Sequence, residues 1–247
     1  MNLTALPGLP ELRPGDDLAS LIAGFCPPDL ADGDVLVVTS KAVSKAEGRQ
    51  VNLADVTSGE QARQLAREHD KDPRLVQVIL DESAEIMRAH EGVLICETRH
   101  GFVCANAGID ASNVPGDDTV LVLPVDPDAS ARALRAGIAG ARGVRPAVLI
   151  SDSFGRAWRL GQTDVAIGAA GFAVLDDWRG RRDAHGRSLT ATQLAVADSV
   201  CAAADLAREK DSGEPVVLAR GLERFVTPDD GPGAAALRRP RENDLFR

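Results

Sequence analysis

The sequence predicts a mixed α/β protein, and three observations lead to this prediction. Short apolar runs of strand length recur along the chain, amphipathic segments with capping residues lie between them, and 44% of the 247 residues are apolar. This content suits a full hydrophobic core, and the length suits one large domain or two intertwined ones. Aromatic residues make up only 3% and Tyr is absent, so we expect Val, Leu, Ile and Ala to build the core.

The expected strands are the apolar runs. Val35–Thr39, for example, follows a turn at Asp32-Gly33-Asp34 and is apolar throughout its first four residues. The full set is Asn2–Ala5, Val35–Thr39, Val93–Cys96, Phe102–Cys104, Val120–Pro124, Ala147–Ile150, Val165–Ala169 and Val216–Ala219.

The expected helices carry start signals or helical spacing. Asp72 and Pro73 precede one of them, in which Leu75, Ile79 and Ile86 lie along one face. Asp16 or Asp17 caps the first, and Asp126-Pro127 opens the fourth. The predicted ranges are Leu18–Phe25, Glu60–His69, Arg74–Ala89, Asp126–Ala141 and Thr190–Ala207.

Three other segments read as irregular structure. Leu9–Gly15 holds two prolines and is a constrained loop, and Trp178–Arg187 is a charged loop. After Val226 the chain is rich in Pro, Gly and Arg. We therefore expect a domain over residues 1–226 and a poorly ordered tail over residues 227–247.

Charge and composition exclude several classes of function. The net charge of −9 argues against nucleic-acid binding but allows a small anionic ligand where basic residues or metal ions gather locally. The four cysteines lack CxxC spacing and the four histidines lack a zinc pattern. No signal peptide or membrane-spanning apolar run is present, so we expect a soluble protein of the reducing cytoplasm with buried thiols.

Three polar segments follow expected strands. Glu97–Asn113 is a loop of small residues whose strongly polar groups include Asp110 and Asn113, although turn chemistry alone also explains them. Ser151–Asp164 contains Asp152 directly after a buried strand. Ser40–Lys45 places hydroxyls and lysines after Val35–Thr39, which suits anion binding and equally suits a solvated loop.

Together these segments allow a metal–phosphate site. If their strands are neighbours, Asp110 and Asp152 converge, and two carboxylates with phosphate oxygens and water form a normal Mg²⁺ or Mn²⁺ site. Ser153 adds a hydroxyl ligand, and Asn113 a hydrogen bond to phosphate. The pairs that can neutralise a phosphate or carboxylate are Arg156 with Arg159 and Lys45 with Ser40. The alternative is that each is an ordinary surface or turn residue. The chain has no P-loop or GxGxxG motif, so a nucleotide must be held another way.

Six ordered blocks give a far more specific signal. The sequence resembles the coenzyme F420-0:γ-glutamyl ligase family over about residues 3–226, in its stand-alone form rather than the form fused to a nitroreductase-like domain. The blocks are Leu9–Leu18 (LPELRPGDDL), Asp32–Arg49 (DGDVLVVTSKAVSKAEGR), Glu97–Asn113 (ETRHGFVCANAGIDASN), Leu123–Ser130 (LPVDPDAS), Ile150–Asp164 (ISDSFGRAWRLGQTD) and Ala195–Asp198 (AVAD).

The resemblance implies a ligase that forms carbon–nitrogen bonds. It implies GTP-dependent addition of L-glutamate to the lactyl carboxylate of F420-0, followed by γ-linked extension, with GDP and phosphate as products. It also implies two Mg²⁺ or Mn²⁺ ions, K⁺ as a further cation, a family-specific mixed α/β fold and an intertwined homodimer. A metal-dependent phosphohydrolase and a non-catalytic deazaflavin-binding protein are the alternatives.

The resemblance also assigns site residues. Asp110 and Asp152 match the ligands of the first metal, Ser153 matches a ligand of the second where relatives usually have Thr, and the substrate candidates remain Arg156 and Arg159. Relatives often carry a Met-Gly-Glu-like turn where this chain has Arg208-Glu209-Lys210, so Glu209 is a candidate for the remaining ligand. The residues matching GTP contacts are Leu9, Pro10, Glu11, Leu12, Ser40, Lys45 and Asn113.

Overall fold

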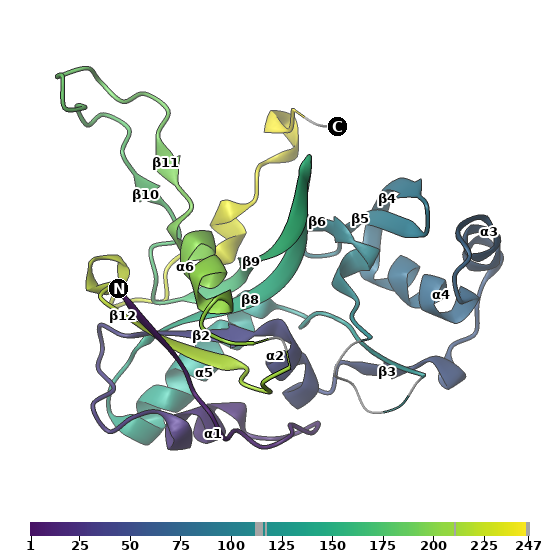
Figure 1. The fold of residues 1–247 in the computed structure, drawn as a ribbon, viewed down its shortest axis with the longest axis horizontal. Helices are drawn as coiled ribbons and strands as arrows, with labels where there is room; N and C mark the ends of the chain where they lie inside the picture. Colours follow the sequence, from purple (N-terminus) through teal and green to yellow (C-terminus); the bar gives the residue numbers. More distant parts are fainter. Residues whose placement is uncertain (112–115, 117, 210, 246–247) are drawn as a thin grey trace.

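The computed structural model is a mixed α/β protein, as predicted (Figure 1), and it describes residues 1–111, 116, 118–209 and 211–245. Its centre is a five-stranded sheet in the order β1-β12-β2-β8-β9. Only the β2–β8 pair is parallel, and its neighbours pair antiparallel. The strands are β1 (Asn2–Ala5), β2 (Val35–Thr39), β8 (Ala147–Arg156), β9 (Arg159–Ala170) and β12 (Val216–Arg220).

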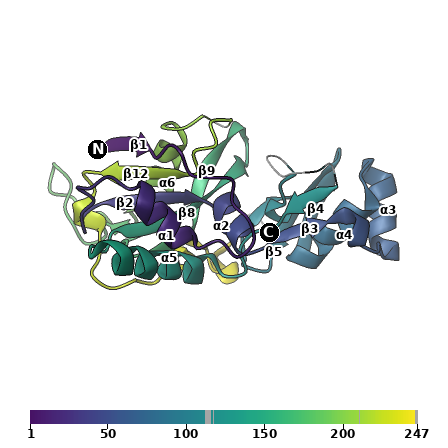
Figure 2. The same ribbon diagram turned by 90° about the horizontal axis from the view of Figure 1, so that it is seen from below.

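Helices cover both faces of this sheet because the central strands are apolar on both sides. Leu36 and Val38 face a cluster with α1 (Leu18–Phe25), α2 (Ser40–Ala46) and α5 (Pro127–Arg142). Val35 and Val37 face the other cluster, which contains α6 (Val196–Asp205). Figure 2 shows α1 and α5 together on one side of the sheet. This three-layer packing holds the carboxyl ends of β2 and β8 rigidly side by side.

A second group of elements lies beside the sheet (Figure 1) and has its own small cores. The antiparallel strands β4, β5 and β6 pack with α3 and α4, while β3 pairs with β7. The elements are β3 (Gln50–Asn52), α3 (Glu60–His69), α4 (Pro73–Glu82), β4 (Ser83–His90), β5 (Val93–Thr98), β6 (Val103–Ala105) and β7 (Thr119–Leu121), with short 3-10 turns at Leu53–Asp55 and Asn106–Gly108.

The predicted helix Arg74–Ala89 is wrong in its second half. The helix ends at Glu82, and the next residues form β4, which pairs with β5. Glu91 and Gly92 make the two-residue hairpin loop with φ of 45° and 80°, the left-handed values that such a loop requires. Ile86 still faces the small core, so its apolar character fits both a helix and a strand. Pairing with β5 determines that this segment is a strand, and the local sequence pattern carries no information about that pairing.

The predicted helix Thr190–Ala207 begins too early. Its first residues belong to an arm in which β10 (Asp176–Asp177) pairs with β11 (Gln193–Leu194), and this arm projects from the molecule (Figure 1). Similarly, β8 extends beyond the predicted Ile150 to Arg156 and forms a long hairpin with β9. The Ser151–Asp164 segment is therefore a strand pair rather than a loop.

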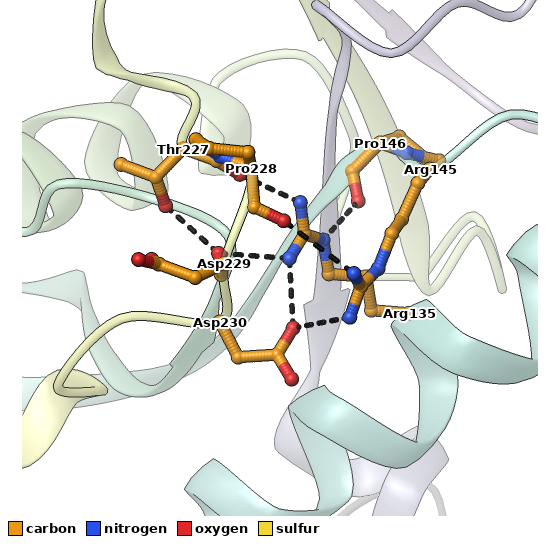
Figure 3. A network of polar contacts seen from close by, with 7 residues as sticks. All are labelled: Arg135, Arg145, Pro146, Thr227, Pro228, Asp229 and Asp230. Atoms are coloured by element: carbon orange, nitrogen blue, oxygen red, sulfur yellow. Dashed lines mark hydrogen bonds and ion pairs between the residues drawn. The ribbon is translucent and has the colours of Figure 1, made fainter.

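The described chain after Val226 makes defined contacts with the rest of the molecule. The buried Arg135 guanidinium of α5 donates to the carbonyl oxygens of Pro146, Thr227 and Asp229 and pairs with Asp230, as Figure 3 shows. Gly171 is required beside it, because a Cβ there would lie 2.3 Å from the guanidinium carbon. Further on, the Asp128 carboxylate accepts from the backbone N–H groups of Ala234 and Ala235. The short 3-10 turns here are Glu223–Phe225, Ala234–Leu237 and Arg241–Asn243.

Two simpler predictions concern the cysteines and membranes. All four cysteines are free and buried, as predicted; they are Cys26, Cys96, Cys104 and Cys201. Within the described part of the chain, no helix has both the length and the apolar character needed to cross a membrane.

Candidate active site

The parallel pairing of β2 and β8 creates the edge on which the site is built. Thr39 pairs with Ser151, so Ser40 and Asp152 follow at the same level of the sheet. α2 begins directly at Ser40, and the Thr39 hydroxyl caps it by accepting from the backbone N–H of Ala42. Polar groups past the carboxyl ends of adjacent parallel strands are the usual location of ligand sites in α/β sheets.

A cavity of about 450 Å³ opens at this edge. Its walls come from the loop before α1, the start of α2, the β8–β9 hairpin and the turn before β12. A much smaller hollow adjoins it and shares Ser40, Lys41 and Asp152, while Asp110 lines only the smaller one. The described residues that line the main cavity are Pro10, Glu11, Leu12, Thr39, Ser40, Lys41, Ala42, Lys45, Ser151, Asp152, Ser153, Asp164, Arg208, Glu209, Asp211, Gly213, Glu214 and Pro215.

Asp110 and Asp152 face the same small hollow although they are far apart in sequence. The Ser40 hydroxyl donates to the Asp152 carboxylate at 2.5 Å, and Lys41 Nζ lies 2.6 Å from the Asp110 carboxylate. Burial, together with the charges of Asp164 and Asp110, raises the pKa of Asp152 to about 7, although the Ser40 hydrogen bond and the Lys41 charge act in the opposite direction. The shift therefore reflects mainly the lost hydration of a buried carboxylate, with a smaller contribution from the neighbouring negative charges.

A buried ion pair between Asp164 and Arg208 also lines the cavity. The Asp164 carboxylate accepts from the Ser151 hydroxyl at 2.8 Å and the Ser153 hydroxyl at 2.6 Å. Arg208 Nη2 lies 2.6 Å from the same carboxylate. Asp164 and Ser153 are partners across β8 and β9, which explains how the strand register brings the two together. The network fixes both hydroxyls in place.

Comparison with known proteins shows the family of the chain. The profile of the family described as F420-0:γ-glutamyl ligase matches residues 8–221 of the chain. The chain belongs to this family. It is 44% identical to the coenzyme F420:L-glutamate ligase of Methanothermobacter thermautotrophicus, with 100% of this chain and 99% of the relative covered.

Two further relatives agree over nearly their whole lengths. The coenzyme F420:L-glutamate ligase of Methanopyrus kandleri is 45% identical, over 96% of this chain and 94% of the relative. The protein of the same name from Haloarcula marismortui is 42% identical, over 100% and 96%. Family membership makes the chain a ligase, as the resemblance predicted.

The charge of the ligase's cavity bears on how an anion could enter it. Among the described lining residues, six side chains are carboxylates and only three are basic. A polyanionic nucleotide would meet repulsion there unless cations neutralised part of this charge. The described residues contain no group of three or more His, Cys, Asp or Glu that could hold a metal alone. Carboxylates and hydroxyls are nonetheless the hard oxygen donors that Mg²⁺ and Mn²⁺ favour, so the residues fit a site completed by ligand oxygens and water.

The structure brings most of the predicted site residues to the ligase's cavity, but not all of them. Leu9 packs against the core instead. Arg156 and Arg159 lie at the tip of the β8–β9 hairpin, outside the cavity lining. Asn113 lies outside the described residues. The predicted residues in the main lining are Pro10, Glu11, Leu12, Ser40, Lys45, Asp152, Ser153 and Glu209.

Lys45 lies in the cavity wall but not in the polar loop that the sequence suggested. It belongs to the last turn of α2, its side chain is largely buried, and its Nζ lies 2.5 Å from the Glu11 carboxylate. The contact joins α2 to the loop before α1, the segment that the sequence analysis predicts to contact the nucleotide.

Several cavity residues escaped the sequence interpretation. They include Asp164, Arg208, Asp211 and Glu214. Asp211 and Glu214 lie in the same turn as the candidate Glu209, but nothing in the sequence distinguishes them from ordinary polar loop residues. The pairing of Asp164 with Arg208 has no local signal, because 44 positions separate them. Lys41 was visible only as part of the Ser40–Lys45 segment.

Proposed function

We propose that this ligase joins L-glutamate to the lactyl carboxylate of F420-0 with GTP, and then adds γ-linked glutamate. The observation that carries the proposal is the cavity at the β2–β8 edge, where Asp152, Ser40 and Lys45 meet in a chain of this family. The relatives are named as ligases of coenzyme F420 and L-glutamate.

The proposed chemistry proceeds through an acyl phosphate. A carboxylate oxygen of F420-0 attacks the γ-phosphorus of GTP, a new P–O bond forms, and the bond to GDP breaks. The amine of glutamate then attacks the acyl carbon, phosphate leaves with the C–O electron pair, and the amine gives up a proton. No covalent nucleophile of the protein is needed.

The residues of the chain have distinct roles in this scheme. Lys45 and Ser40 bind phosphate oxygens from the α2 side of the cavity. Asp110, Asp152 and Ser153 would hold the divalent cations, with Glu209 as a further ligand. Bound there, Mg²⁺ or Mn²⁺ would supply electrostatic stabilisation of the phosphoryl oxygens. The Ser40–Asp152 hydrogen bond and the Asp164 network keep these oxygen donors oriented before a ligand arrives.

The remaining parts of the proposal are the assembly and the substrate contacts. We propose a homodimer of two intertwined lobes in the cytoplasm and K⁺ as an additional cation. Arg156 and Arg159 carry positive charge on an exposed hairpin tip, where Leu160 is almost fully exposed. In the proposed dimer, this exposed tip would contact the second copy of the chain or the substrate bound to that copy. Sedimentation analysis of the whole protein tests the assembly.

Mass spectrometry of the reaction products tests the function. The protein is incubated with F420-0, GTP, MnCl₂, KCl and L-glutamate, and we expect a coenzyme heavier by one or more glutamyl groups, with GDP formed in step. Omission of glutamate, GTP or metal should abolish the product. GDP release without F420-0 and glutamate would instead indicate a phosphohydrolase. Binding of the coenzyme without turnover would indicate a carrier protein.

A further inference from the structure

The turn after α6 places one arginine in the wall of the cavity. Arg208 is only 6% exposed in its side chain, yet it lines the cavity beside Ser151 and Asp164. In relatives, a Met-Gly-Glu-like turn at this place contributes to nucleotide and metal binding. That turn has no arginine, so the family resemblance gives the guanidinium itself no role.

Among the described residues, the guanidinium has partners at Nη2 and Nε but not at Nη1. Nη2 donates to Asp164 at 2.6 Å and lies 3.3 Å from the Ser151 hydroxyl. Nε lies 4.0 Å from the Asp205 carboxylate. Nη1 is buried and has no hydrogen-bond partner among the described residues. Buried polar groups in native proteins normally have a partner, so an unpaired cationic N–H beside a ligand cavity calls for one.

The anchoring of Nη2 prepares Nη1 for a ligand. Asp164 already accepts from Ser151 and Ser153, and its rigid position fixes the guanidinium plane. A planar guanidinium with one arm held and one arm unpaired is suited to an oxyanion, since its N–H groups donate in a fixed fork.

We propose that Arg208 is an anion-binding residue whose Nη1 contacts a terminal-phosphate oxygen of the nucleotide. This inference rests on the proposed function. The phosphate is favoured over the carboxylate of glutamate because Asp164 links Arg208 to Ser153, next to the oxygen donors assigned to the divalent cation. In phosphoryl transfer, the group shared by a divalent cation and an arginine is the phosphoryl group itself.

The test compares GTP with GDP in the Arg208→Lys variant. Lysine keeps the charge that pairs with Asp164 but lacks the second arm. By calorimetric titration of the whole protein in MgCl₂, we expect the affinity for GTP to fall about tenfold and that for GDP to change little. Arg63→Lys is the matched control, because Arg63 is an exposed residue of α3 that pairs with Glu60. It should bind both nucleotides like the wild type.

Other outcomes overturn the assignment. Equal loss of GTP and GDP affinity would place Arg208 away from the terminal phosphate, and unchanged GTP affinity with a raised KM for glutamate would assign it to the carboxylate. A wild-type protein that does not prefer GTP to GDP also refutes it.

If Arg208→Lys melts early, the double variant Asp164→Asn/Arg208→Met removes both buried charges and should show the same loss of GTP preference. The titrations need neither F420-0 nor glutamate, so failure of glutamylation by a wild type that prefers GTP refutes only the proposed function.

Discussion

At the scale of single residues, Asp152 is the carboxylate on which the proposed metal site depends. Burial raises its pKa to about 7, so the free protein carries this charge at a cost. Asp152→Asn removes the charge and keeps an oxygen that can accept from Ser40. We expect glutamylation to fall at least about a hundredfold, because a neutral amide is a weak cation ligand and metal stabilisation is worth several kcal/mol. The melting temperature in EDTA should stay equal or rise.

The control for this variant is Asp177→Asn. Asp177 pairs with Arg179 on the projecting arm, away from the cavity. Its replacement should leave turnover unchanged. Near-normal turnover of Asp152→Asn with saturating Mn²⁺ would refute the assignment of Asp152 as a metal ligand.

Lys45 supports a second prediction at this scale. Lys45→Met keeps the buried stem and removes the ammonium group, and Glu11 is left mostly in water, since 65% of its side chain is exposed. We expect about tenfold weaker GTP binding and a loss of stability below about 1 kcal/mol. Nucleotide titration and thermal melts measure the two effects, with Lys71→Met as the control outside the cavity. A large fall in melting temperature at unchanged GTP affinity would show that Lys45 is structural.

At the scale of elements, Asp198 fastens α6 to β9. Its carboxylate accepts from the backbone N–H of Ala166, but burial raises the pKa of Asp198 above its ordinary value. A folded-state pKa above the unfolded one means that the charged form destabilises the fold, and this effect grows as pH rises through both values. Asp198→Asn keeps the acceptor without the charge. We expect it to melt higher than the wild type at pH 7, with the difference shrinking towards pH 4. A lower melting temperature at pH 7 would contradict this account.

The bounds of a helix are predictable from the sequence where capping residues within the same segment determine them. The range of α5 was predicted within a residue or two because Asp126 caps it and Pro127 starts it. The same reasoning identified Asp72 at the start of α4, but not the end of that helix. The helix ends because the residues after it pair with β5, and the sequence between Ser83 and Ala89 contains no signal of that pairing.

The same limit applies to the site. Asp110 and Asp152 were candidates because each follows an apolar run, which is visible in the sequence. Asp152 lies on β8 beside the end of β2, whereas Asp110 reaches the same hollow through its bridge to Leu121 and its ion pair with Lys41. Neither of these two long-range contacts has a local signal in the sequence. The pairing of Asp164 with Arg208 depends on both the β8–β9 register and the turn after α6. No spacing within one segment predicts it.

At the scale of the whole molecule, Arg135 ties the end of the chain to its centre. The network in Figure 3 includes three backbone carbonyl oxygens and Asp230, which Arg145 also contacts. Arg135→Met leaves these acceptors without their donor. We expect a loss of about 3 kcal/mol in the free energy of unfolding, measured by urea denaturation. The reason is that the buried carbonyl oxygens lose their donor and the Asp230 carboxylate loses one of its two arginine partners. Faster hydrogen exchange over residues 227–237 should accompany it.

Arg132→Met on the same helix is the control for this effect. Arg132 is exposed and only approaches Asp126, at 3.9 Å. Its loss should change stability by less than about 0.5 kcal/mol. Equal effects of the two variants would show that the Arg135 network contributes no special stability.

The pairing of β1 with β12 has a consequence for synthesis on the ribosome. β1 has no partner strand until Val216–Arg220 has been synthesised, and β2 also lacks its antiparallel neighbour until then. At roughly 5–20 residues per second, that interval is on the order of 10–40 s. During it, the edge of an apolar central strand is open to pairing with other chains. Nascent molecules of this ligase thus pass through an aggregation-sensitive stage that the finished sheet conceals, and conditions that slow translation prolong it.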